Sequence, residues 1–155
     1  MARSAEEMLF QDNETAFTPI PWDRTAMEWR HLIHSPFCPL TPAQKAVLTS
    51  MCLYGKKWGE DIFPSQREIA FRAGVSVTCV NDTMKTAERD GWVIRHMVGT
   101  GQGYKRTVYE LAIPAGIHDA TALLKAKFWQ PPYKYELVRN KSGFSLVLRD
   151  PTCST

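Results

Sequence analysis

Residues 63–76 read Phe63-Pro-Ser-Gln-Arg-Glu-Ile-Ala-Phe-Arg-Ala-Gly-Val-Ser, and the predicted fold rests chiefly on these residues. Ser65 can cap a helix that has Glu68 as its third residue. Ser76 can cap a second helix after a turn at Gly74. The stretch therefore predicts two short helices joined by a glycine turn.

Apolar residues recur at helical spacing in both helices, so one face of each can be buried. They are Ile69, Ala70 and Ala73 in the first helix and Val80, Met84 and Ala87 in the second. The second helix then leaves an outward set of mostly short polar residues: Val77, Thr78, Asn81, Asp82, Lys85 and Thr86. Such groups can read base edges in a major groove, and an ordinary solvated helix face is the alternative.

The residues that follow predict a β-hairpin. Gly91 suits the C-cap of the second helix, and residues 92–96 are rich in strand formers. Residues 97–103 predict a glycine-rich loop, from which a second strand returns over residues 104–113. Residues 62–63 can add a short strand to this hairpin.

Basic side chains gather about the hairpin with no acid between them. They are Arg95, His96, Lys105 and Arg106. Cations at a hairpin tip can approach a phosphate backbone or a minor groove. The hairpin is therefore a candidate wing.

A further helix precedes this region. Thr41-Pro-Ala-Gln supplies a cap followed by proline at the first helical position. Its expected apolar face consists of Ala43, Val47, Met51 and Tyr54.

Taken together, these residues resemble the winged helix-turn-helix family found in many bacteriophage and plasmid replication proteins and in related small DNA-binding regulators. The matching pieces cover about half of the chain, in the family's order and at its spacing. They are Leu40-Thr-Pro-Ala-Gln-Lys-Ala-Val-Leu, Phe63-Pro-Ser-Gln, Ile69-Ala, Ala73-Gly-Val-Ser, Val80 and Asp90-Gly-Trp-Val-Ile.

The resemblance implies an α+β fold with a winged helix-turn-helix core and a DNA-binding surface. It places Ser65, Gln66 and Arg67 near the DNA backbone and Ser76, Thr78, Asn81 and Lys85 toward the groove. Two residues depart from the family pattern: Cys79 replaces a usual threonine, and Asp82 stands where a basic residue is common. Asp82 could accept from a cytosine amino group or repel phosphate.

The remaining sequence predicts extensions that pack on this core, because each end is too short to stand alone comfortably. We expect an N-terminal extension with one amphipathic helix (1–37), the winged helix-turn-helix domain (38–113) and a C-terminal extension with a helix and a β-hairpin (114–155). The N-terminal helix is marked by Trp22, Ala26, Trp29 and Ile33.

The C-terminal extension shows a second helical stripe and then a hairpin pattern. The stripe consists of Ile117, Ala120, Leu123, Leu124 and Phe128. Beyond it, Tyr133, Tyr135 and Leu137 are expected to face Phe144, Leu146 and Leu148 across Asn140-Lys-Ser-Gly.

Two further features of the extensions leave alternatives open. Residues 125–149 are basic, because they contain six cations and only one acid, Glu136. The cations are Lys125, Lys127, Lys134, Arg139, Lys141 and Arg149. This end therefore either contacts DNA or forms a solvated surface. Trp22, Trp29, Phe128 and Trp129 either fold back onto the core or form a homodimer contact, which would link two DNA half-sites.

Composition restricts the class of protein. The 155 residues, 44% of them hydrophobic, suffice for one compact domain with extensions, and no apolar span is long enough for a membrane segment. The N-terminus lacks the apolar stretch of a secretory signal, so we expect a cytoplasmic protein. Cys38, Cys52, Cys79 and Cys153 lack the paired spacing of a metal site, and in a reducing compartment they are expected to be free thiols rather than disulfides.

The sequence gives little support for an enzyme. His31-Leu-Ile-His-Ser-Pro-Phe-Cys lacks the further ligands that a zinc site needs. Gly99-Thr-Gly-Gln-Gly lacks the lysine of a phosphate-binding loop and the hydroxyl residue that follows that lysine. The carboxylates form no nuclease-like cluster that the sequence identifies. We therefore expect no catalytic site, no metal and no cofactor.

The sequence thus predicts a sequence-specific double-stranded DNA-binding protein, with Asn81, Thr78 and Lys85 reading bases. We expect a transcriptional regulator of a phage, plasmid or other mobile element, since little room for a further initiator domain remains after Ile113. An initiator that binds a replication origin is the alternative. A winged helix that serves as a protein–protein interaction adaptor is the competing class, kept open by Asp82 and the modest net charge of +3.

Overall fold

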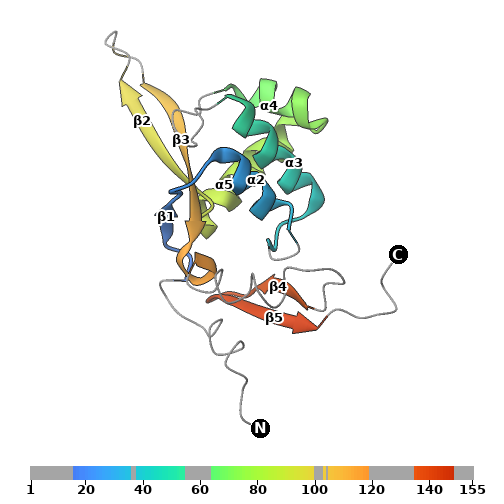
Figure 1. Ribbon diagram of the computed structural model, residues 1–155. Helices are drawn as coiled ribbons and strands as arrows, with labels where there is room; N and C mark the ends of the chain where they lie inside the picture. The colour runs from blue at the N-terminus through green and yellow to red at the C-terminus, as the bar shows by residue number, and fades with distance from the viewer. Residues whose placement is uncertain are drawn as a thin grey trace.

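The computed structural model describes residues 16–35, 38–54, 64–99, 103, 105–118 and 135–148. Its helices are α2 (Ala26–Ile33), α3 (Pro42–Met51), the short 3-10 helix η1 (Cys52–Tyr54), α4 (Gln66–Ala73) and α5 (Val77–Asp90). Its strands are β1 (Pro19–Pro21), β2 (Val93–Gly99), β3 (Lys105–Pro114), β4 (Tyr135–Arg139) and β5 (Phe144–Leu148). The helices pack together on one side of the long β2–β3 hairpin, and the β4–β5 hairpin lies at the opposite end of the molecule from the tip of β2 (Figure 1). This arrangement confirms the α+β class and is consistent with a winged-helix core.

Side-chain caps start the helices at the predicted residues. The Ser65 hydroxyl accepts from the Glu68 N–H at 3.1 Å, and the Ser76 hydroxyl accepts from the Cys79 N–H at 3.1 Å. Thr41 and Gln44 form a reciprocal capping box at the start of α3. Each cap satisfies N–H groups that would otherwise lack a partner in the first turn, so the sequence fixes these helix starts locally.

Helices α4 and α5 each end at a glycine. Gly74 ends α4 with φ 73°, and Gly91 ends α5 with φ 88°, both in the left-handed region. The second position is also crowded, since a Cβ on Gly91 would lie 2.5 Å from the carbonyl oxygen of Phe17. These glycines set the turn between α4 and α5 and the exit from α5 into the hairpin.

Helices α3, α4 and α5 contact one another pairwise around a shared core. The predicted stripes of α4 and α5 supply Ile69, Ala70, Val80, Met84 and Ala87. In α3 the prediction was wrong at one position, because Ala43 is exposed whereas Val47, Leu48 and Met51 are fully buried. Helix α3 packs against α2, α4 and α5, so it buries a broader face than a single stripe.

The three-stranded antiparallel sheet has the order β1–β3–β2. Strand β2 runs to Gly99, so residues 97–99 form ladder pairs with β3 rather than belonging to the predicted loop. The third strand comes from the N-terminal extension, where Pro19–Pro21 pairs with the end of β3. Residues 62–63, for which a strand was expected, lie outside the described residues.

The N-terminal extension packs onto the core through Trp29. This indole is fully buried, and its N–H donates to the carbonyl of Ala112 at 2.8 Å. Trp22 is partly buried and donates to the carbonyl of Thr25 at 2.8 Å. Trp29 therefore packs on the core of its own chain rather than forming a homodimer contact, because a fully buried side chain cannot contact a second copy. Phe128 and Trp129 lie outside the described residues.

The predicted C-terminal hairpin forms, with Leu137 opposite Leu146 and the Asn140 N–H donating to the Gly143 carbonyl at 2.8 Å. Its main anchor is Phe144, which is buried and meets the Phe17 ring edge-on with centroids 5.0 Å apart. The expected helix of the extension begins at residues 115–118, and the rest of it lies outside the described residues. No helix in the described ranges is long and apolar enough to cross a membrane.

Candidate nucleic-acid interface

The outward face of α5 carries the side chains that the sequence assigned to it. Ser76, Val77, Thr78, Asp82 and Lys85 are exposed. The opposite face is buried and consists of Val80, Thr83, Met84, Ala87 and Asp90. Because burial fixes the rotation of the helix about its axis, one ridge of hydroxyl, carboxylate, amine and methyl groups remains available to a partner.

Asn81 and Thr86 were predicted to face outward, but both are half-buried and so less exposed than the other residues of the ridge. The Asn81 side chain lies near α4, where its Oδ1 accepts from Nε2 of Gln66 at 3.3 Å. Gln66 was predicted to lie near the DNA backbone, and the structure also ties its amide to a predicted base-reading residue. Sequence reasoning missed this contact, because residues 15 positions apart meet only through the packing of α4 on α5.

The start of α4 presents Ser65 and Arg67 in exposed positions. The Ser65 hydroxyl is already engaged as the helix cap, where it accepts from the Glu68 N–H at 3.1 Å and donates to the Glu68 carboxylate at 3.5 Å, so its outward role is limited to the second lone pair. Glu68, also exposed, follows Arg67 directly and places one carboxylate in the same turn. Arg67 is therefore the principal cation that this turn can offer to a phosphate.

The wing cations have acidic neighbours that the sequence analysis did not foresee. Arg95 Nε lies 3.4 Å from a carboxylate oxygen of Glu88, at the end of α5. His96 Nε2 lies 3.2 Å from a carboxylate oxygen of Glu110, on the returning strand. No acid stands between these cations in the sequence, but β2 places Arg95 and His96 beside acids that lie outside that stretch.

These wing pairs are weakly held. The side chains of Arg95 and Glu88 are 50% and 43% exposed, and ion pairs in such positions contribute little, about 0 to 1 kcal/mol. A phosphate can therefore replace Glu88 as the partner of Arg95 at small cost. Arg106 is exposed on β3, opposite Val98, whereas the side chain of Lys105 lies outside the described part of the chain.

The two departures from the family pattern occupy different environments. Asp82 is exposed on the outward ridge, where it can either accept from a base or repel phosphate. Cys79 is half-buried and packs against the core cluster. The cysteine therefore belongs to the packing of α5 more than to its outward chemistry.

Helix α4 also exposes a feature that sequence reasoning passed over. Phe71 is 88% exposed, and the neighbouring Arg72 donates through Nε to the Tyr54 hydroxyl at 2.9 Å. The helical stripe of Ile69, Ala70 and Ala73 already placed residue 71 on the opposite, solvent side. That spacing was the signal for an exposed aromatic residue.

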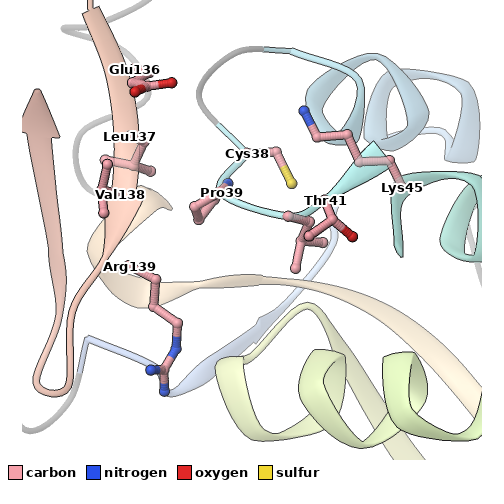
Figure 2. A pocket seen from close by; sticks show the side chains of 9 residues that line it. Cys38, Pro39, Thr41, Lys45, Glu136, Leu137, Val138 and Arg139 are labelled. Atoms are coloured by element: carbon pink, nitrogen blue, oxygen red, sulfur yellow. The ribbon is translucent and has the colours of Figure 1, made fainter. Parts of the chain in front are cut away.

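A pocket of about 500 Å³ lies between the start of α3 and strand β4 (Figure 2). Both cations in its wall have partners within the fold: Lys45 donates to the Ser35 carbonyl at 3.0 Å, and Arg139 points away from Lys45 and Glu136 (Figure 2) to pair with Asp90. Burial raises the pKa of the Cys38 thiol in its wall to about 12, so this thiol is neutral. We assign no ligand to this pocket.

The histidine pair considered for zinc is not assembled into a site. His31 and His34 are both exposed, while Cys38 is buried. Across the residues that the structure describes, no group of three or more histidine, cysteine or acidic side chains is placed to hold a metal ion.

Comparison with known proteins identifies the class of the central module. Residues 40–93 match the family model of a helix-turn-helix domain, a range that runs from just before α3 to the first residue of β2. No curated protein and no solved structure gives a significant match to the chain. The protein thus carries a helix-turn-helix domain, which supports DNA binding by this module.

Proposed function

We propose that the protein binds double-stranded DNA sequence-specifically and regulates transcription in a phage, plasmid or other mobile element. The outward ridge of α5 carries this proposal. It combines the exposed Thr78, Asp82 and Lys85 with the half-buried Asn81, on a helix whose opposite face is fully packed. Amide, hydroxyl and amine groups on a rigid helix are the chemistry that distinguishes base pairs in a major groove. The proposal includes no catalytic step and no cofactor.

The position of the β2–β3 hairpin also supports DNA binding with α5 in the major groove. The end of β2 and the beginning of β3 project beyond the helices on the same side of the molecule as α4 (Figure 1). Arg95 and Arg106 on this hairpin are exposed, as is Arg67 on α4. With α5 in the groove, these cations would hold phosphates on either side, which fixes register without reading sequence.

Site-specific occupancy supports a regulatory role, because a protein bound at a promoter excludes polymerase from it. The mobile-element setting rests on the family resemblance of the sequence. A replication initiator that marks an origin would use the same surface. A reporter driven by a promoter that contains the selected site separates the two, since a regulator changes transcription from it and an origin-binding protein need not.

Selection of bound duplexes from a random pool is the first test. Wild-type protein should enrich one motif, and Asn81→Ala should lose preference at one base at a cost of about 1 to 3 kcal/mol. A two-fold symmetric motif would indicate that a homodimer binds two half-sites. Failure of the wild-type protein to enrich any motif would contradict sequence-specific binding.

The adaptor alternative is favoured by one observation, the 88% exposure of Phe71 on α4. Phenylalanine is among the residues enriched at protein–protein interfaces relative to the rest of the surface. Phe71→Ser should leave duplex binding unchanged if α5 is a DNA reader. If the domain is an adaptor, the wild-type protein should enrich no DNA motif and its binding to a partner should depend on Phe71 rather than on salt.

A further inference from the structure

We infer that Gln66 is the positioning residue that sets the base preference of Asn81, and that the base read there is adenine. The inference rests on the proposed DNA-binding function and assigns a specificity to it. Gln66 Nε2 donates to Asn81 Oδ1 at 3.3 Å, and both side chains are half-buried between α4 and α5.

The backbones of Gln66 and Asn81 are held in place by the helices that carry them. Gln66 is the first residue of α4, held by the Ser65 cap, and Asn81 lies in the second turn of α5, which starts at the Ser76 cap. The shared core of Ile69 and Val80 holds the two helices together. The amide contact therefore joins two rigid elements, and it restricts the one torsion by which an asparagine amide can reverse its oxygen and nitrogen.

The polarity of the amide decides which base it matches. Adenine presents an N7 acceptor and an N6 donor side by side in the major groove, so an asparagine must offer an N–H and an oxygen along one edge. The Asn81 oxygen has two lone pairs, and Gln66 uses one of them. The second lone pair and the Nδ2 hydrogens remain for the bidentate contact. Reversing Asn81 alone would set its donors against the Gln66 donor, and restoring the hydrogen bond would require Gln66 to reverse as well. The donating Gln66 amide therefore favours the orientation in which Asn81 Oδ1 accepts from Gln66 and Nδ2 is left for adenine N7.

The pair also distinguishes Asn81 from its neighbours on the ridge. Thr78 and Lys85 are exposed on the ridge, and a hydroxyl or an ammonium can turn its donors toward more than one base. An amide held in place loses less freedom on binding and penalises a mismatched base more strongly. We therefore place the sharpest base preference of the interface at Asn81.

The test compares full-length variants on four duplexes that differ only at the base position whose preference Asn81→Ala removes. Gln66→Met keeps the length of the side chain without the donor, and Gln66→Glu replaces the donor with an acceptor that favours the reversed Asn81 amide. Arg67→Met is the matched control in the same turn of α4. Thermal unfolding of each variant establishes that it is folded.

Wild-type protein should prefer adenine at this position. Gln66→Met should reduce that preference roughly two- to tenfold, the factor that corresponds to one net hydrogen bond. Gln66→Glu should reduce it at least as far, and its added charge cancels in the ratio between bases. Arg67→Met should weaken binding to all four duplexes alike and leave the preference unchanged. In an Asn81→Ala background, Gln66→Met should change nothing further.

Three outcomes would overturn the inference while leaving DNA binding intact. These are full retention of the preference in Gln66→Met, an equal loss on all four duplexes that adds to Asn81→Ala, and a wild-type preference for another base at this position. The second would show that Gln66 only contacts phosphate. If the wild-type protein enriches no motif at all, the proposed function fails, and the inference fails with it.

Discussion

Arg139 on β4 places its Nε 2.8 Å from a carboxylate oxygen of Asp90, the last residue of α5. Asp90 is buried, and it also accepts two hydrogen bonds from Arg89, at 2.9 and 3.3 Å. The Arg139 guanidinium lies 4.5 Å from the centroid of the Phe17 ring. From the sequence, Arg139 was one of the C-terminal cations that could contact DNA. In the structure it holds the C-terminal extension to the end of α5, the candidate recognition helix.

Loss of the Arg139 contact should destabilise the domain. Arg139→Met keeps the aliphatic stem but leaves the buried Asp90 with Arg89 alone, and we expect a loss of about 1.5 to 3 kcal/mol in the free energy of unfolding. Urea denaturation measures this loss. Lys141→Met removes an exposed cation from the turn of the same hairpin and should stay within about 0.5 kcal/mol of wild type. Equal midpoints for the two variants would show that the ion pair does not stabilise the fold.

The two positive-φ glycines that flank α5 should respond differently to alanine. Gly74→Ala meets no atom within 4 Å, so its cost is the left-handed backbone alone, about 1 to 2 kcal/mol. Gly91→Ala adds a Cβ 2.5 Å from the Phe17 carbonyl oxygen, and backbone cannot move aside as a flexible side chain can. We expect a further loss of about 1 to 3 kcal/mol at Gly91 in chemical denaturation. A Gly74 variant as unstable as the Gly91 variant would contradict this packing.

Removing Glu88 should strengthen DNA binding without preference for sequence. Glu88→Gln releases Arg95 from its partner and removes one negative charge beside the wing, while stability should change by less than about 1 kcal/mol. Binding isotherms on specific and scrambled duplexes should shift together. Glu136→Gln, an exposed acid on β4 at the far end of the molecule, is the control and should leave affinity unchanged. Unchanged affinity in Glu88→Gln would remove Arg95 from the interface.

The wing should contribute through phosphate contacts alone. Lys105→Ala and Arg106→Ala are each expected to weaken binding to every duplex and to lower the slope of log K against log salt by about 0.9, the value for one phosphate contact. Titrations at several salt concentrations measure that slope. A slope identical to that of wild type would exclude the substituted residue from contact with DNA.

Two buried thiols should make stability fall in alkali. Burial raises the pKa of both Cys38 and Cys52 to about 12 in the folded chain, whereas an unfolded thiol titrates near about 8.5. Below the unfolded pKa both states are protonated and stability is unaffected. As pH rises from about 9 toward 12, only the unfolded chain loses the protons, so stability falls by about 1.4 kcal/mol per pH unit for each thiol.

Comparison with alanine variants isolates this effect from other titrating groups. The stability advantage of wild type over the Cys38→Ala, Cys52→Ala double variant should shrink between pH 8 and about pH 10.5. Denaturation curves at a series of pH values measure the difference. Parallel profiles for the two proteins would show that the thiols are not buried as neutral groups.

Much of the helix-turn-helix region was predictable because its signals are local. Ser65, Ser76, Gly74 and Gly91 fix helix starts and ends through hydrogen bonds and backbone angles that depend only on near neighbours in the chain. The stripe on α5 likewise fixes which face is buried. The turn at residues 140–143 followed from the same reasoning.

The errors concern contacts between distant residues. Residues 97–99 read as loop from their own composition and become strand because β3 offers hydrogen-bond partners. The pairing of Pro19–Pro21 with β3 has no local sequence signal at all. Acids beside Arg95 and His96 were missed because Glu110 approaches His96 only when β3 pairs with β2, and Glu88 approaches Arg95 only when the hairpin packs on α5.

Local sequence is enough to set the order of the helices, the caps and glycines that bound them, and the polar character of the outward ridge, because these depend on interactions within one or two helical turns. Packing between elements sets which side chains act together. It joined Gln66 to Asn81, Arg139 to Asp90 and Trp29 to Ala112, since hydrogen bonds and ion pairs between elements form only where packing brings their atoms within reach.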